Sequence, residues 1–250
     1  MVSLVLVGNQ EAAAVRRIAI IGNSTEWGSL GPDGLSWTNP AASLEALLRI
    51  APAGNPWRRA RVYNLAIPAS DTRHWVDQFE PAFCAYLGST FNRVMEVACA
   101  QQVPFAYAVL PAYAGRIDAV LAVLGTNDIG NLPGTNPVDT VDRLAQLPSI
   151  LAPAVTFIAP PFPATLEPRQ SFVPLVRREM LARGLITGPD WPALPVFDGV
   201  HLSQGGYAAA AGLWIDALLG TLVTQTTTST STTSITTTTT STESTTTTTS

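Results

Sequence analysis

The chain has 250 residues, 46% of them hydrophobic, and its 14 basic and 18 acidic side chains give a formal net charge of −4. Every basic residue is an arginine, and no run of them forms the basic patch that binding to nucleic acid requires. No apolar run reaches the ~18 residues of a membrane span, and two histidines, two cysteines and no glycine-rich phosphate loop predict neither a metal site nor a cofactor.

Composition divides the chain into three parts. Residues 1–16 form an N-terminal extension whose short apolar run lacks the basic start of a signal peptide. Residues 17–223 are long and apolar enough for one domain with a full core. Residues 224–250 are threonine and serine apart from Gln225, Ile235 and Glu243, so this tail is expected to be disordered. Such a tail is compatible with an O-glycosylated stalk on an extracellular or cell-surface protein, and equally with a low-complexity expansion that has no function.

Strand and helix patterns alternate through residues 17–223. Short apolar runs predict strands at 18–22, 61–65, 117–124, 155–159 and 194–197. Helical patterns lie between and after them, at 41–50 (capped by Asn39), 75–100 with a break at Pro81, 137–147, 172–183 and 206–222. This order is typical of an α/β fold and predicts three layers, α/β/α, around a mainly parallel sheet of about five strands. In such folds ligands bind beyond the carboxyl ends of the strands.

The first predicted strand runs into a Gly-Asn-Ser turn at 22–24. A Gly-x-Ser turn after a buried strand is a place where an α/β sheet presents a reactive serine. Most such turns are structural only. Ser24 is therefore a candidate nucleophile, and the support for this role depends on which residues lie at the ends of the other predicted strands.

Two further predicted strands also end in polar motifs. Gly-Thr-Asn-Asp at 125–128 follows the third strand, and alone it is typical of a turn. Asp-Gly-Val-His at 198–201 follows the last strand, where Asp198 can orient His201 as a general base near neutral pH. A lone histidine near a strand end is more often a surface residue, but a serine, an amide and an Asp/His pair at three strand ends are the components of a serine esterase.

These motifs together resemble the SGNH, or GDSL-type, family of serine esterases, and the resemblance covers most of residues 17–222. The family's Gly-Asp-Ser motif corresponds to 22–24, and its Asn-x-Gly-x-x-Gly motif corresponds to the degraded Asn-Leu-Ala-Ile-Pro-Ala at 64–69. The Gly-x-Asn-Asp and Asp-x-x-His motifs are intact at 125–128 and 198–201. The resemblance implies the flavodoxin-like SGNH fold and a lipase-like hydrolase of carboxylic esters that needs no cofactor.

The resemblance also implies a role for each matching residue. Ser24, His201 and Asp198 correspond to the catalytic triad. The backbone N–H groups of Ser24 and Ala69 and the side-chain amide of Asn127 correspond to the oxyanion hole. Ala69 replaces a glycine of the family, so its methyl group crowds the site if the position needs a positive φ. Ser70 is then the alternative second donor. The other departure, Asn for Asp at position 23, keeps the shape of the side chain.

Several questions stay open at this level. The substrate ranges over short or medium acyl esters, acetylated sugars, lipids and thioesters. An O-acyltransferase and a catalytically weak surface or adhesion module on the same fold are alternatives to the hydrolase. We expect a monomer with a small-molecule or carbohydrate ester as its partner. Cys84 and Cys99 either pair or pack as buried thiols, and Asp71 or Thr72 is expected to cap a helix.

Overall fold

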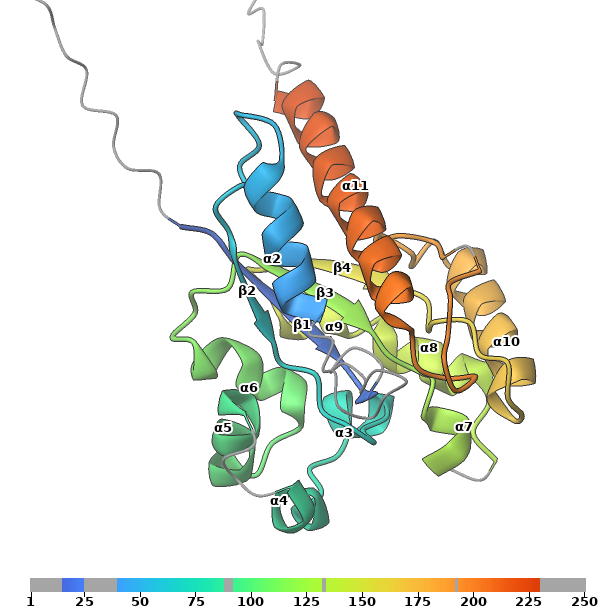
Figure 1. The fold of residues 1–250 in the computed structure, drawn as a ribbon. Helices are drawn as coiled ribbons and strands as arrows, with labels where there is room; N and C mark the ends of the chain where they lie inside the picture. Colours follow the sequence, from blue (N-terminus) through green and yellow to red (C-terminus); the bar gives the residue numbers. More distant parts are fainter. Residues whose placement is uncertain (1–14, 25–39, 88–91, 132–133, 192, 230–250) are drawn as a thin grey trace, which may run out of the picture.

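The computed structural model describes residues 15–24, 40–87, 92–131, 134–191 and 193–229. Most of the N-terminal extension, the expected cap Asn39 and the tail from residue 230 onward lie outside this described part. The elements, in chain order, are β1 (Arg17–Gly22), α2 (Pro40–Ile50), β2 (Arg61–Asn64), α3 (Thr72–Val76), α4 (Pro81–Leu87), α5 (Arg93–Gln101), α6 (Phe105–Ala112), β3 (Ala119–Val123), α7 (Asp128–Asn131), α8 (Pro137–Leu144), α9 (Leu147–Ile150), β4 (Val155–Ala159), α10 (Arg169–Ala182) and α11 (Gln204–Ser229) (Figure 1).

The strands form one parallel sheet in the order β2-β1-β3-β4. Gly22 at the end of β1 pairs with Val123, and Val123 pairs with Ala159 on β4. Three strands therefore end in register at one edge of the sheet. Because the strands are parallel, the segments that follow them all leave at that edge.

The described residues contain four strands, and the expected fifth, 194–197, is wrong. Val196 makes only an isolated antiparallel bridge with Leu202. Pro195 has no N–H to give to a ladder, and the chain turns back on itself at Gly199, where φ is +84°. The apolar run at 194–197 therefore belongs to a short hairpin outside the sheet.

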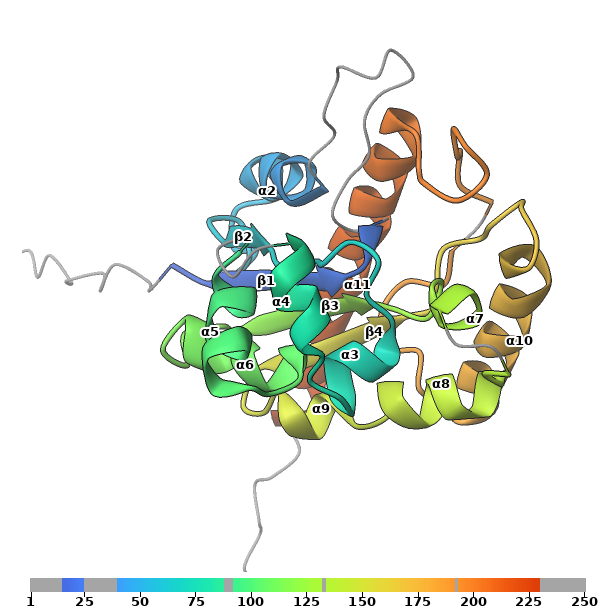
Figure 2. The same ribbon diagram turned by 90° about the horizontal axis from the view of Figure 1, so that it is seen from below.

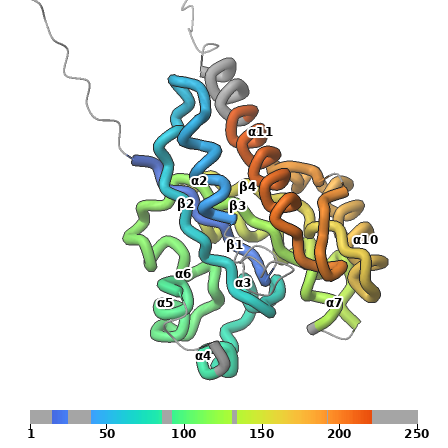
Figure 3. Tube along the Cα trace, viewed as in Figure 1, coloured from blue at the N-terminus to red at the C-terminus, as the bar shows by residue number. Residues whose placement is uncertain are grey.

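Helices cover both faces of the sheet, as the alternating pattern predicted (Figure 2). Helices α2 and α11 lie side by side on one face (Figure 3). Their buried side chains join those of one face of β1 and β3 in a first core, and α11 contributes Tyr207, Ala210, Ala211, Trp214 and Leu218. The second core lies on the opposite face, under α3, α5, α6, α8 and α10.

Helix boundaries differ from the expectation where prolines interrupt the chain. The expected helix 75–100 is three helices, α3, α4 and α5, with Pro81 at the start of α4. Helix α6 was missed because its sequence is apolar on every side and contains Pro111. Helix α11 continues past the expected end at residue 222 to Ser229. None of the helices in the described part of the chain could span a bilayer.

Cys84 on α4 and Cys99 on α5 form a disulfide. Of the two interpretations of these cysteines, the structure selects pairing. The bond ties two short helices together on the same side of the sheet as α3.

Candidate active site

Ser24 lies two residues beyond the last residue of β1, at the edge where the parallel strands end. Its side chain is half-buried, whereas the preceding Asn23 is buried. The Ser24 hydroxyl oxygen is 3.0 Å from Nε2 of His201. The structure thus brings together the serine and the histidine that the motifs had singled out.

His201 is held by a tight hairpin formed by residues 195–203. The N–H of Phe197 donates to the carbonyl of His201 at 3.0 Å, and the N–H of Ser203 donates to the carbonyl of Pro195 at 2.9 Å. Gly199 at the tip has to be glycine, because a β-carbon there would stand 2.6 Å from Cγ of Leu166. The hairpin therefore fixes the backbone that carries the imidazole.

Asp198 binds both the backbone and the ring of His201. Its Oδ1 accepts the N–H groups of Val200 at 3.0 Å and His201 at 2.7 Å, and its Oδ2 lies 2.5 Å from Nδ1 of His201. Burial alone would raise the pKa of Asp198, but these N–H donors and the His201 ring lower the pKa below its usual value. An ionised Asp198 accepts the Nδ1 proton and leaves Nε2 free to accept a proton from Ser24.

Ala69 lies in a turn that is attached to the end of β1. The N–H of Ile67 donates to the carbonyl of Gly22 at 3.0 Å, and the Ser70 hydroxyl contacts the same carbonyl at 3.3 Å. Ala69 is exposed and has a φ of 63°, a left-handed conformation that favours the glycine of the family. The N–H of Ser70 already donates to Ile67 at 3.2 Å, so Ser70 is the weaker candidate for the second oxyanion donor.

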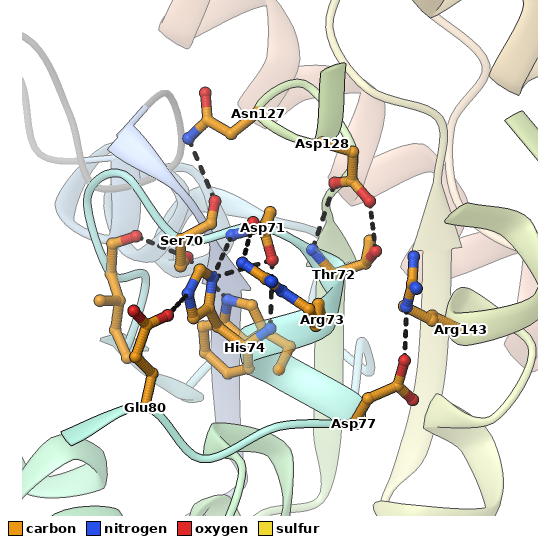
Figure 4. A network of polar contacts seen from close by, with 12 residues as sticks. Ser70, Asp71, Thr72, Arg73, His74, Asp77, Glu80, Asn127, Asp128 and Arg143 are labelled. Carbon is orange, nitrogen blue, oxygen red and sulfur yellow. Dashed lines mark hydrogen bonds and ion pairs between the residues drawn. The ribbon is translucent and has the colours of Figure 1, made fainter. Parts of the chain in front are cut away.

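Asn127 approaches the same turn from the end of β3. Its side-chain amide donates to the carbonyl of Ser70 (Figure 4), and the two atoms are 3.1 Å apart. The residue is only 6% exposed. The preceding Gly125 has φ of +113°, and a β-carbon there would stand 3.0 Å from Pro161 and 3.1 Å from Thr140. The glycine of the Gly-x-Asn-Asp motif is thus required by the close approach of α8 and the loop after β4.

Asp128 forms a buried contact that the sequence motifs did not reveal. Its carboxyl group is fully buried and accepts hydrogen bonds from the N–H of Thr72 at 3.2 Å, from the Thr72 hydroxyl, and from the Thr140 hydroxyl at 3.0 Å. Burial, reinforced by the nearby charge of Asp71 and opposed by the hydroxyl and N–H donors, raises the pKa of Asp128 to about 6. These partners are 56 and 12 residues away in the chain, so no local pattern indicates them.

The second histidine, His74, has a different environment. Asp71 caps α3, as expected, in a capping box in which its side chain accepts the N–H of His74 at 3.2 Å. The His74 ring is 2.8 Å from Asp71 and 2.6 Å from Glu80, and it is 4% exposed. Burial alone would lower the pKa of His74, but these two carboxylates raise it. His74 therefore serves as a buried link between two acids.

The ring of Phe197 stacks on the ring of His201, with centroids 6.0 Å apart and an interplanar angle of 28°. Phe197 is 42% exposed, unlike most of the large apolar residues that the structure describes. The sequence interpretation placed Phe197 only as the end of a strand.

Within the described residues, no group of three or more His, Cys, Asp and Glu side chains could hold a metal ion.

Comparison with solved structures identifies the fold. A lipase/acylhydrolase from Enterococcus faecalis has a TM-score of 0.52 and 17% identity, over 83% of this chain and 97% of that one. Est24, a carbohydrate acetylesterase from Sinorhizobium meliloti, has a TM-score of 0.51 and 17% identity, over 83% and 99%. A catalytic mutant of Axe2, an acetylxylan esterase from Geobacillus stearothermophilus in which a serine is replaced by alanine, has a TM-score of 0.52 and 16% identity, over 81% and 94%.

No protein-family model matches the sequence, and no curated protein matches it either. The structural similarity therefore carries the assignment of the fold. The chain has the α/β/α fold of the SGNH/GDSL-type esterases, with four strands described in its central sheet. The predicted fold class is confirmed.

Proposed function

We propose that the protein hydrolyses carboxylic esters through an acyl-enzyme intermediate on Ser24. The observation that carries this proposal is the continuous set of contacts from Asp198 to His201 at 2.5 Å and from His201 to Ser24 at 3.0 Å. A serine, an imidazole and a carboxylate in this order generate a nucleophile at neutral pH.

The first half of the reaction follows from these contacts. Nε2 of His201 takes the proton of the Ser24 hydroxyl while the oxygen attacks the ester carbonyl. Asp198 stabilises the imidazolium that forms and fixes its tautomer. His201 then gives the proton to the leaving alcohol, and the acyl group stays on Ser24. A water molecule repeats the two steps and releases the acid.

Hydrogen-bond donors have to stabilise the negative charge that develops on the carbonyl oxygen. We assign this role to the backbone N–H groups of Ser24 and Ala69 and to the amide of Asn127, in agreement with the family pattern. The hydrogen bond between Asn127 and Ser70 and the attachment of Ile67 to Gly22 support the assignment, since they draw these segments toward the end of β1. One such donor typically contributes ~3 kcal/mol to the stability of the transition state.

Short acyl groups, including acetyl groups on carbohydrates, are the substrates that we propose. Two of the similar structures are named as acetylesterases of carbohydrate or xylan, and a third as a lipase/acylhydrolase. The Axe2 structure, a catalytic mutant with a serine changed to alanine, supports a catalytic serine on this fold.

Hydrolysis of p-nitrophenyl acetate, butyrate and octanoate tests the activity and ranks the acyl chain lengths. A serine-directed fluorophosphonate, followed by peptide mass spectrometry, tests the nucleophile. We expect hydrolysis with label on Ser24 and no label on a Ser24→Ala variant. A folded protein that is inert and unlabelled would exclude the hydrolase and favour a binding module.

A further inference from the structure

Asp128 is a buried carboxyl group beside the proposed active site that the triad does not use. It is fully buried, and its two oxygens accept three hydrogen bonds. Placing a carboxyl group in a protein interior costs free energy unless donors surround it. The residues that donate these hydrogen bonds are therefore the ones that Asp128 can hold in place.

Two of the three donors belong to the segment that carries the proposed oxyanion donor. The N–H of Thr72 binds Oδ2 of Asp128, and the Thr72 hydroxyl binds Oδ1 (Figure 4). Thr72 follows Ala69 by three residues, across Ser70, whose carbonyl accepts the amide of Asn127. Asn127 and Asp128 are adjacent, so one dipeptide after β3 binds the Ala69–Thr72 segment at two points.

The third donor connects Asp128 to the scaffold. The Thr140 hydroxyl, on α8, binds Oδ1 of Asp128 at 3.0 Å. Thr140 is fully buried, and its helix packs against α3 and α10. The carboxyl group thus links a rigid helix on one side to the Ala69–Thr72 segment on the other.

We propose that Asp128 is a positioning residue that holds the Ala69–Thr72 segment where the Ala69 N–H and the Asn127 amide both face the substrate carbonyl oxygen. This inference rests on the proposed ester hydrolysis. Without the bonds from Asp128, the far end of the turn at Ala69 would be fixed only by the hydrogen bonds of Ser70 and by the packing of α3. Above its pKa of about 6 the carboxyl group is ionised, and both of its oxygens then act only as acceptors.

A matched pair of variants separates positioning from stability. Thr72→Val and Thr140→Val each remove one hydroxyl that donates to the same oxygen of Asp128, and both residues are fully buried. The two changes should lower the melting temperature to a similar extent. We expect Thr72→Val to lower kcat on p-nitrophenyl acetate about tenfold with little change in KM, a fraction of the ~100-fold loss of a whole oxyanion donor. Thr140→Val should keep kcat within about threefold, since it leaves both Thr72 bonds in place.

Rescue variants complete the test. Asp128→Asn keeps the shape of the side chain, and because a threonine hydroxyl can donate or accept, all three contacts can form. It should retain kcat within a few fold, whereas Asp128→Ala should lose ~100-fold. Thr72→Ser keeps the hydroxyl and should also retain kcat. If Thr72→Val does not fold, Thr72→Ala against Thr140→Ala makes the same comparison.

The outcomes distinguish this inference from the proposed function. Equal losses of kcat in Thr72→Val and Thr140→Val, in proportion to their losses of stability, would overturn the positioning role. So would a folded Thr72→Val with unchanged kcat. If instead Ser24→Ala retains full activity, the proposed function itself fails, whatever the threonine variants do.

Discussion

Ser24 and His201 are separated by 177 positions in the chain, and their side chains meet at 3.0 Å. The sheet explains this contact, because the segments that follow parallel strands all begin at the same edge of the sheet. Ser24 follows β1 directly, while His201 reaches that edge on the hairpin that precedes α11. The contact therefore depends on the topology of the sheet and on the hairpin, and each can be tested separately from the chemistry.

Replacing either member of this pair should remove the activity and spare the fold. Ser24→Ala and His201→Ala are each expected to lower kcat by at least ~1,000-fold, since the members of a triad act as a unit. Ser24 is half-buried and the His201 side chain is 28% exposed, so neither supplies much packing. The melting temperatures should stay within a few degrees of the parent protein. Activity above one hundredth of the parent in Ser24→Ala would remove Ser24 from the role of nucleophile.

His74→Ala should show the opposite pattern, with a loss of stability. The ring is buried between Asp71 and Glu80, and removing it leaves Asp71 buried without this partner, at a cost of ~3 kcal/mol. The pKa of His74 is raised in the folded state, so its stabilisation is full below ~6.5 and is lost as the pH rises through the raised pKa. Urea unfolding of parent and variant at pH 6 and pH 9 should therefore give a smaller difference at pH 9. A difference that grows at pH 9 would contradict this interpretation.

The sequence indicated those residues of the candidate site that belong to local motifs. The Gly-Asn-Ser turn, Gly-x-Asn-Asp and Asp-x-x-His each place a side chain within a few residues of a strand or hairpin end, and the structure brings Ser24, Asp198 and His201 into contact. The bonds from Asp128 to Thr72 and Thr140 were not foreseen, because no local pattern joins residues on three separate elements.

The errors in the fold have two origins. An apolar run such as 194–197 is compatible with a strand, but Pro195 within it and the turn at Gly199 after it make it half of a hairpin. Helix α6 lacks the polar face that reveals a helix in a sequence, since it packs into the core through Phe105 and Val109 and carries Pro111. For α6, packing into the core explains a helix that the local pattern of apolar and polar residues does not show.

The disulfide should stabilise the domain without affecting the reaction. Cys84 and Cys99 enclose a loop with a sequence separation of 15, which corresponds to ~3 kcal/mol in the loop-entropy account. A Cys84→Ser, Cys99→Ser double variant should lose about that much free energy of unfolding and keep kcat. Dithiothreitol should destabilise the parent protein to the level of the double variant. It should leave the double variant unchanged, and equal sensitivity of both proteins would argue against the bond.

Asp128→Asn should remove the part of the pH dependence of stability that comes from this carboxyl group. The pKa of Asp128 is raised from 3.8 to about 6, so this carboxyl group contributes fully below pH ~4 and its contribution is lost as the pH rises through 6. A shift of that size corresponds to about 3 kcal/mol. Relative to the parent, the variant should therefore gain roughly 3 kcal/mol between pH 4 and pH 7 in denaturant unfolding. Asp216→Asn, at an exposed position on α11, controls for the loss of one carboxyl group. A difference between parent and Asp128→Asn that is constant with pH would contradict the raised pKa.

Ala69→Gly should stabilise the protein or leave its stability unchanged. Ala69 has a φ of 63°, a conformation in which a β-carbon costs about 1 kcal/mol of folding free energy. Glycine avoids this strain, but its greater freedom in the unfolded chain costs roughly 0.5–1 kcal/mol, so the two effects nearly cancel. Ala114→Gly is the matched control, because Ala114 is also exposed and has a φ of 52° just before β3, away from the edge where the strands end. Both variants should melt at or slightly above the temperature of the parent protein. Proline would be a less informative change, since its φ near −65° would reverse the turn as well as delete the N–H.

The activity of Ala69→Gly should also stay close to that of the parent protein. The bonds of Ser70 to Ile67 and Asn127 hold the peptide on the far side of Ala69, so kcat should stay within about threefold, far from the ~100-fold loss of an oxyanion donor. A large loss of kcat in Ala69→Gly with none in Ala114→Gly would show that the methyl group itself is needed to aim this N–H.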